Sequence, residues 1–375
     1  MKHIFRSELG MLYEHVMQYL EDWITLHPRP LHKGFLEKWK ADIWNHLESI
    51  CPDDEDLEVV EGILEAYSEW AHEIPQKKET SNLLQLLDRP QTNQRTTDWY
   101  NEFQKCLTAS EFYKLFGSQR ERAVLVVQKS GILENSGHST KTASLREKMS
   151  PFDWGICFEP VVKQILEKKW AATIHDCGRF VHQTDTRLAA SPDGIITACK
   201  IPDLVGHLLE IKCPKSREIG KKIPTEYYYQ MQLQLEVTDV SACEYVEARF
   251  EFLPVPSLEI DTSTFSGNLA VIGAYHDVIG DILPTRYMYG PIGDFTWNPL
   301  LETGETLLEL NTWKLVKLHH ERVFRDQQWF STLVPKIDEF WKDVEKAKVG
   351  EFSVPESSRK KPIVCQIVES ESEAL

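Results

Sequence analysis

Apolar residues recur at helical spacing throughout the first quarter of the chain. Leu9, Leu12 and Val16 lie three or four residues apart, and residues 57–67 show the same repeat. This spacing places apolar side chains on one face of a helix. A polar stretch rich in Gln, Asn and Thr ends this part. We therefore expect a helical accessory domain over residues 1–95.

The remainder of the chain mixes helix and strand signals. Helical spacing occurs over residues 158–166, 225–238 and 329–344, and strand-like runs occur over residues 208–211, 242–252 and 312–318. Alternating strands and helices are typical of an α/β domain. We expect this domain over residues 96–348 and a flexible Ser-, Glu- and Lys-rich tail over residues 349–375. Pro335 should kink or interrupt the last helix.

Residues 254–312 are punctuated by proline and glycine. Such residues mark turns and loops. We interpret this part as an insertion into the α/β domain, without a motif of its own.

The strongest local signals surround Asp193. It lies in a Pro-Asp-Gly turn between two apolar runs, which predicts a hairpin connection. The run over residues 208–211 follows and predicts a central strand. Alternate residues of a strand share a face, so Glu210 and Lys212 should project together while Ile211 points the other way.

This arrangement has a chemical use. Two carboxylates and a backbone carbonyl can hold Mg²⁺, which prefers oxygen ligands. We expect Asp193 and Glu210 to bind Mg²⁺, with the Ile211 carbonyl as a further ligand and Mn²⁺ as a candidate substitute. Such a cation polarises a phosphoryl oxygen and lowers the pKa of a bound water. Lys212 would align that water or balance charge in the transition state. The alternative is a surface hairpin with an ordinary Glu–Lys pair.

The net charge of −16 argues against a broadly basic surface. Contacts to nucleic-acid phosphates need Lys and Arg. The acidic excess is uneven, since residues 1–95 hold 18 Asp and Glu against 10 Lys and Arg. Basic residues gather instead between residues 212 and 222. We expect any phosphate binding to be local, in a groove, and the alternative is a solvated loop.

Cysteine usage and hydropathy exclude several classes of protein. The eight cysteines contain no Cys-x-x-Cys pair, which argues against a zinc ribbon and gives no support to an iron–sulfur cluster. We expect most to be reduced and buried. No apolar run reaches membrane-spanning length, and the first residues lack a signal-peptide segment. We therefore expect an intracellular protein without a membrane partner.

Several motifs in order resemble a known family. Ser191-Pro-Asp-Gly followed by Leu209-Glu-Ile-Lys-Cys-Pro resembles the core of phage lambda exonuclease and the YqaJ-type viral recombinase nucleases of the PD-(D/E)xK superfamily. Trp154-Gly-x-x-x-Glu and Tyr227-x-x-Gln-x-Gln match the same family. The similarity covers residues 99–346. It implies a restriction-endonuclease-like core, with a mixed central sheet flanked by helices, and an additional N-terminal helical domain.

The resemblance also implies a function. It is that of a Mg²⁺-dependent exonuclease that digests double-stranded DNA ends, 5′ to 3′, in viral recombination, repair or replication in the host cytoplasm or nucleus. Glu159 would bind a second metal or its water, and Gln230 would hold Lys212 or the scissile phosphate. Lys215 and Arg217 would contact DNA. A single-strand annealing protein is a candidate partner, and an oligomer is compatible with the family. An endonuclease of the same superfamily and an inactive DNA-binding or recombinase-partner module are the alternatives.

The family also binds a terminal 5′-phosphate. Serines at the positions of Ser110 and Ser191 serve this pocket, together with an arginine. Here Phe103 occupies the place of the arginine, and Lys105 is a candidate substitute. This departure leaves anchoring of the 5′-phosphate open.

Both Ser110 and Glu159 also have structural interpretations. Ser110, or Thr108 before it, could cap a helix that begins near Glu111. Glu159 directly precedes Pro160, and the first turn of a helix favours both proline and acidic residues. In that case Glu159 would only complement the helix dipole.

Overall fold

The computed structural model describes residues 83–94, 96–131, 149–253, 265–277 and 279–356. Most of the accessory domain expected over residues 1–95, and most of the tail, lie outside the described residues. The elements in chain order are α4 (Thr97–Glu102), β1 (Leu107–Thr108), η1 (Ala109–Phe116), α5 (Gln119–Lys129), α6 (Pro151–Trp170), β2 (Thr173–His175), β3 (Phe180–Val181), β4 (Leu188–Ala190), β5 (Gly194–Ala198), η2 (Pro202–Leu204), β6 (Leu208–Lys212), α7 (Thr225–Thr238), β7 (Ala242–Phe252), β8 (Ser266–His276), β9 (Asp281–Tyr289), β10 (Glu305–Phe324), α8 (Gln327–Ser331) and α9 (Val334–Lys348).

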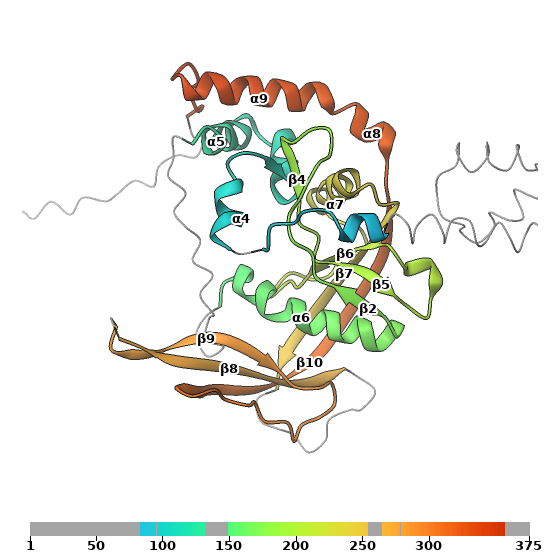
Figure 1. Cartoon of the computed structure of the whole chain (residues 1–375), viewed down its shortest axis with the longest axis vertical. Helices are drawn as coiled ribbons and strands as arrows, with labels where there is room; N and C mark the ends of the chain where they lie inside the picture. Colours follow the sequence, from blue (N-terminus) through green and yellow to red (C-terminus); the bar gives the residue numbers. More distant parts are fainter. Residues whose placement is uncertain (1–82, 95, 132–148, 254–264, 278, 357–375) are drawn as a thin grey trace, which may run out of the picture.

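A seven-stranded sheet forms the centre of the molecule, in the order β2-β5-β6-β7-β10-β8-β9 (Figure 1). Strands β6 and β7 are parallel, and the other neighbours are antiparallel. Helix α6 packs on one face, while α7 packs on the other. The α/β fold with a mixed central sheet flanked by helices is therefore confirmed.

Strand β6 lies inside this sheet and divides its side chains between the two faces. Leu208 belongs to the apolar cluster that contains α7, whereas Leu209 and Ile211 belong to the cluster that contains α6. Because side chains alternate along a strand, Glu210 and Lys212 project to the α7 face together with Leu208. The predicted shared face of these two charged residues is observed.

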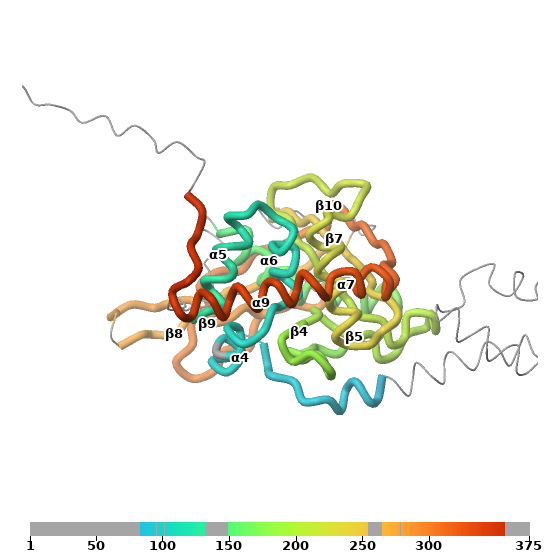
Figure 2. The backbone as a smooth tube through the Cα atoms, turned by 90° about the horizontal axis from the view of Figure 1, so that it is seen from above, coloured from blue at the N-terminus to red at the C-terminus, as the bar shows by residue number. Residues whose placement is uncertain are grey.

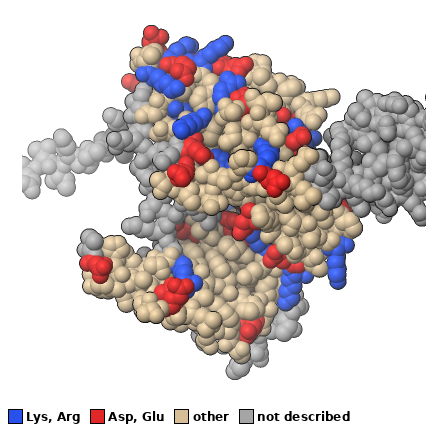
Figure 3. Space-filling view, viewed as in Figure 1, with Lys and Arg blue, Asp and Glu red and all other residues tan. Residues whose placement is uncertain are grey.

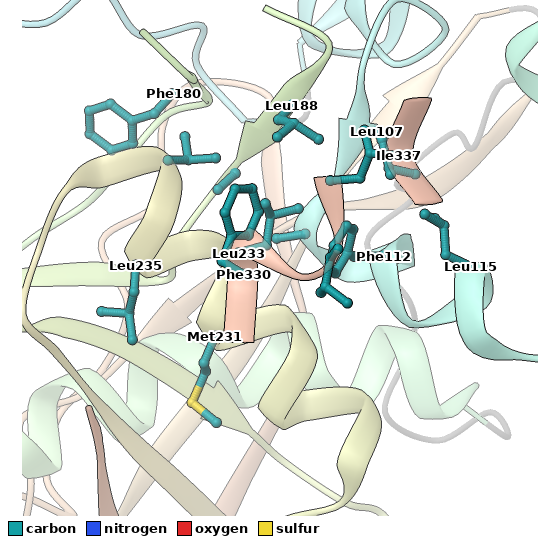
Figure 4. Packing of buried hydrophobic residues seen from close by; sticks show 14 of the residues in the cluster. Leu107, Phe112, Leu115, Phe180, Leu188, Met231, Leu233, Leu235, Phe330 and Ile337 are labelled. Carbon is teal, nitrogen blue, oxygen red and sulfur yellow. The ribbon is translucent and has the colours of Figure 1, made fainter. Parts of the chain in front are cut away.

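Two apolar cores hold the layers together. The core on the α7 side joins α7 to η1, α5, the short strands and the C-terminal helices; Figure 4 shows Met231, Leu233 and Leu235 of α7 among its members. The core on the α6 side includes the ring of Phe158, which stacks on Phe250 with the ring centroids 4.4 Å apart. Burying one such side chain contributes about 1.5–3 kcal/mol.

The hairpin predicted at Pro-Asp-Gly is wrong. Strand β4 pairs with β1 and β3 in a separate three-stranded sheet, whereas β5 pairs with β2 and β6. Residues 191–193 therefore connect two sheets. Gly194 serves a close approach between strands, because a Cβ there would lie 2.7 Å from Cγ2 of Ile174 on β2. The turn signal was local and carried no information on strand partners.

The part that we interpreted as an insertion contains two long strands. Strands β8 and β9 pair with each other, and their far end projects from the body of the protein (Figures 1 and 2). Pro284 lies in β9 at the edge of the sheet, where a missing N–H is tolerated. Gly267 lies against the Trp313 ring, where a Cβ would be 3.0 Å from Cζ2. Proline and glycine therefore mark positions within strands here.

The C-terminal helices follow the predicted break. Asp326 caps α8 by accepting a hydrogen bond from the Trp329 N–H. Pro335 lies in the first turn of α9, so the helical stretch is divided in front of it, as expected. Helix α9 runs beside α5 in both views (Figures 1 and 2). An ion pair of 2.8 Å between Arg122 and Asp343 joins these two helices.

Residues 83–94, on the accessory side of the expected boundary, pack onto the α/β domain. Leu83 and Leu86 belong to the core on the α7 side. Thr92 pairs with Arg179 through an isolated antiparallel bridge. Among the described helices none is long and apolar enough to cross a membrane. The six described cysteines are free and five of them are buried, as expected.

Candidate functional site

One cavity contains all five residues predicted to be catalytic. It has a volume of about 1190 Å³, and its lining includes Glu159, Asp193, Glu210, Lys212 and Gln230. Small-molecule pockets typically measure about 300–1,000 Å³. The cavity therefore has room for a ligand larger than a metabolite.

Strand β6 and helix α7 form a hydrogen-bonded group at the cavity wall. Lys212 Nζ makes an ion pair with Glu210 Oε1 and donates a hydrogen bond of 3.1 Å to Gln230 Oε1. Gln230 Nε2 donates to Glu210 Oε1 over 2.6 Å. The structure thus brings Gln230 to Lys212, as the family resemblance implied.

Gln234, one helical turn after Gln230, is placed on the same helix face by the sequence but received no role there. Its Nε2 donates a hydrogen bond of 2.7 Å to Glu210 Oε2, and the residue is fully buried. The signal was present, because residues four apart lie on the same helix face. Gln232, by contrast, points to the core, where it bonds the Phe324 carbonyl and the Asp326 N–H.

Asp193 is half-buried and lies near two other carboxylates, those of Glu210 and Glu159. Its Oδ2 accepts a hydrogen bond of 2.6 Å from the Ile211 N–H. Burial, together with repulsion from Glu210 and Glu159, raises the pKa of Asp193 well above its usual value. Burial alone would lower the pKa of Lys212, but the negative charges of Glu210 and Asp193 raise it above its usual value. Lys212 is therefore a protonated ammonium at neutral pH.

Glu159 approaches the same cavity from α6. The helix begins at Pro151 with Ser150 as its cap, so Glu159 lies in the third turn and the predicted first-turn position is wrong. A role limited to the helix dipole is therefore excluded, because that effect is confined to the first turn. Glu159 makes an ion pair of 2.9 Å with Lys163. Lys163, four residues further on, was not singled out from the sequence.

The donor set suits a hard divalent cation bound mainly by two carboxylates. Within the described ranges, no three His, Cys, Asp or Glu side chains form a group that could hold a metal ion. However, Mg²⁺ usually keeps several waters and takes only one or two protein carboxylates. Burial and the negative charges of Glu210 and Glu159 raise the pKa of Asp193, and a bound cation would offset the charge repulsion. Asp193 and Glu210 therefore fit such an ion.

A second wall of the cavity is formed by one edge of the three-stranded sheet. Strands β1 and β4 are parallel and β3 is antiparallel to β4, so residues just beyond the ends of β1 and β4 lie at the same end of the sheet as the residue that precedes β3. These residues are Ser110, Ser191 and Arg179, and all three line the cavity. The Trp99 indole N–H donates a hydrogen bond of 3.3 Å to Ser191 Oγ.

Arg179 was not singled out from the sequence either. It is 1% exposed, and its Nη1 donates to the Trp99 carbonyl. Its guanidinium lies 4.3 Å from the Trp99 ring centroid. Among the described residues, its Nε and Nη2 have no hydrogen-bond partner. No sequence pattern distinguishes this arginine, because its position depends on the pairing of β3 with β4.

Phe103 and Lys105 differ in their relation to the cavity. Phe103 lines it, and its ring lies 3.5 Å from Nζ of the buried Lys129. Lys105 is exposed and is not part of the lining. The cap of η1 is Thr108, one of the two residues considered, and Ser110 lies within this helix.

Lys215 and Arg217, which we expect to contact DNA, both line the cavity. Lys215 Nζ donates a hydrogen bond of 2.7 Å to the Met149 carbonyl, and Arg217 makes an ion pair with Glu247. On the face drawn in Figure 3, basic and acidic side chains are interspersed. This pattern agrees with local rather than broad electrostatic attraction.

Comparisons with known proteins agree with the family resemblance. Residues 98–241, which include Ser110 and the five predicted catalytic residues, match the family model described as the YqaJ-like viral recombinase domain. The resemblance is thereby confirmed over these residues. Uncharacterized protein R354 of Acanthamoeba polyphaga mimivirus is 22% identical in an alignment 295 positions long, which covers 67% of this chain and 52% of that protein. The chain thus spans about half the length of this curated relative.

Two solved structures resemble the fold at low identity. The alkaline exonuclease LHK-Exo from Laribacter hongkongensis is 16% identical with a TM-score of 0.39, covering 68% of this chain and 95% of that one. A phage-related exonuclease from Haemophilus somnus 129PT is 12% identical with a TM-score of 0.33, covering 66% and 95%.

Proposed function

From a chain whose residues 98–241 match the YqaJ-like viral recombinase domain, we propose a divalent-cation-dependent nuclease that hydrolyses phosphodiester bonds at DNA duplex ends. One observation supports this proposal above the others. Asp193, Glu210 and Lys212 line a single cavity, with Lys212 paired to Glu210. This cavity wall combines two carboxylates that would bind a cation with the charged amino group of Lys212.

The chain's own residues would share the work of hydrolysis. Asp193, Glu210 and the Ile211 carbonyl would hold the principal ion, and Glu159 would hold a second ion or a water on it. The bound cation would polarise the phosphoryl group and acidify a water. Lys212 would keep its proton on Nζ and donate a hydrogen bond to the attacking water or to the phosphate. Gln230 would fix Lys212 through its Oε1.

The reaction adds water across one phosphodiester bond. The water oxygen forms a bond to phosphorus, the bond from phosphorus to the leaving sugar oxygen breaks, and that oxygen takes up a proton. Because Lys212 is charged at neutral pH, it acts as a donor to developing negative charge and not as the base. Mg²⁺ is the expected ion, and Mn²⁺ is the substitute to test.

The second wall of the cavity would bind the end of the DNA. Ser110 and Ser191 offer hydroxyl groups, and Arg179 offers N–H groups without partners among the described residues. Planar guanidinium groups match phosphate oxygens well. We therefore propose that Arg179, and not Lys105, supplies the cationic group for a terminal 5′-phosphate. This orientation would favour digestion in the 5′–3′ direction.

A digestion assay tests the chemistry and the end preference separately. Wild-type protein and Asp193→Asn are incubated with 5′-phosphorylated linear duplex and with closed circular duplex, with Mg²⁺ or with EDTA. We expect the wild type to degrade only the linear DNA and only with Mg²⁺, and Asp193→Asn to be inactive. Digestion of circular DNA would favour the endonuclease alternative. Activity that is unchanged by Asp193→Asn would refute the proposed site.

A binding assay distinguishes the remaining alternative. An inactive DNA-binding or recombinase-partner module would bind duplex ends yet leave them intact with every cation. Participation in viral recombination, and a single-strand annealing partner, stay proposals that follow from the family. Copurification with such a protein from infected cells would test the partner.

A further inference from the structure

The carboxylate of Glu210 receives donors at both oxygens. Oε1 accepts from Lys212 Nζ and from Gln230 Nε2, whereas Oε2 accepts from Gln234 Nε2 over 2.7 Å. Each carboxylate oxygen offers about two lone pairs. Within the described residues, Oε1 is therefore fully used and Oε2 keeps one lone pair. This asymmetry selects Oε2 as the atom that is left for a cation.

We propose that Gln234 is a positioning residue that fixes Glu210 Oε2 for the divalent cation, an inference that rests on the proposed nuclease function. Gln234 does not belong to the lining of the cavity, so it acts through Glu210. Its hydrogen bond prevents rotation of the carboxylate about its last torsion, which is otherwise soft. Partners of this kind, behind a metal ligand, set its orientation and basicity.

A purely structural role for Gln234 fits the surroundings less well. Its Oε1 is buried without a hydrogen-bond partner among the described residues, although buried amides normally satisfy both ends. The one hydrogen bond that the amide group makes within the described ranges is therefore the bond to Glu210. An apolar residue would avoid the unsatisfied carbonyl, so the amide is retained at a cost to stability.

Gln232 is a matched control on the same helix. It is 1% exposed and carries the same amide, but it bonds only the backbone, at the Phe324 carbonyl and the Asp326 N–H. Gln232→Leu therefore removes buried hydrogen bonds without touching Glu210. Any general effect of replacing a buried glutamine by leucine in α7 will be seen in this variant.

The test is calorimetric titration of the full chain with Mn²⁺ alone, without DNA. We expect Gln234→Leu to bind Mn²⁺ about 10- to 100-fold more weakly than the wild type. Gln232→Leu should stay within about twofold of the wild type once corrected for folded fraction. In nuclease assays, Gln234→Leu should need a higher Mn²⁺ concentration for half-maximal rate and regain activity when Mn²⁺ is raised.

The outcomes separate this inference from the function on which it rests. A folded wild type that does not bind Mn²⁺ overturns the proposed function. A wild type that binds, with equal affinity in folded Gln234→Leu, overturns the role of Gln234 alone. If Gln234→Leu does not fold, Gln234→Asn is used, since it keeps a buried amide but is one methylene too short to reach Glu210. Unchanged Mn²⁺ affinity in that variant is equally decisive against the inference.

Discussion

Changing Arg179 to glutamine should remove the preference for phosphorylated 5′ ends that we propose for this protein. In the structure, Nε and Nη2 of Arg179 are buried without a hydrogen-bond partner among the described residues, at the wall that also carries Ser110 and Ser191. A hydrogen bond to a charged group contributes about 1.5–3 kcal/mol. Since about 1.4 kcal/mol is tenfold, losing one such bond lowers binding by about 10- to 150-fold.

The assay compares kcat/KM for 5′-phosphorylated and 5′-hydroxyl duplexes within each variant. Arg179 also donates to the Trp99 carbonyl and lies 3.8 Å from Glu102, so its replacement will lower stability as well. A ratio measured on one enzyme preparation cancels any loss of folded protein. We expect the ratio to fall to near one in Arg179→Gln and to be partly kept in Arg179→Lys, which retains the charge but loses the planar fork.

Arg187 provides the control. It is half-buried on the same small sheet, where Asp185 and Asp338 neutralise it, and it does not line the cavity. Arg187→Gln removes the same charge and should leave the ratio unchanged, as should Lys105→Ala. Suppose that the wild type prefers 5′-phosphorylated duplex and that Arg179→Gln has the same ratio of kcat/KM values for the two duplexes. The proposed role of the Arg179 guanidinium would then be wrong.

Three further predictions concern chemistry and stability. Lys212→Ala should lower the single-turnover rate by about 10²–10³-fold at saturating DNA, because a donor to the developing charge is lost. Phe158→Ala should reduce the free energy of unfolding in urea by about 3–5 kcal/mol, since the ring is fully buried in the core on the α6 side. Burial alone would raise the pKa of Glu244. Hydrogen bonds from His207 and His320 lower this pKa by more than burial raises it, so the pKa lies well below its usual value. Ionised Glu244 therefore stabilises the fold above about pH 4.3. We expect wild type and Glu244→Gln to differ fully in their free energy of unfolding in urea at pH 7, and this difference to shrink as the pH falls below 4. A difference that stays constant with pH would contradict this.

The sequence was most informative where local pattern and chemistry coincide. Strand β6 could be predicted from its apolar run, and its period of two placed Glu210 and Lys212 on one face. The break at Pro335 followed from the geometry of proline alone. The family motifs then located Glu159, Asp193 and Gln230, which have no common local signal.

The sequence was least informative where position depends on strand partners. Pro-Asp-Gly has the same local signature whether it closes a hairpin or links two sheets, so the separate small sheet was not foreseen. The cavity position of Arg179 follows from that sheet. Glu159 was expected in the first turn of its helix, but α6 begins at Pro151, so Glu159 lies in the third turn. Glycine and proline within β8 and β9 were also interpreted as loop signals, because a local pattern does not show which strands pair.

The short connection between the two sheets has a consequence for the size of the product. Ser191 and Asp193 are two positions apart in the chain, so their Cα atoms are separated by at most about 7 Å. One belongs to the wall proposed to grip the terminus, and the other to the wall proposed to cut. The backbone between Ser191 and Asp193 thus fixes the distance between these two walls. Fragments released by this protein should therefore have one uniform length instead of a broad distribution of lengths.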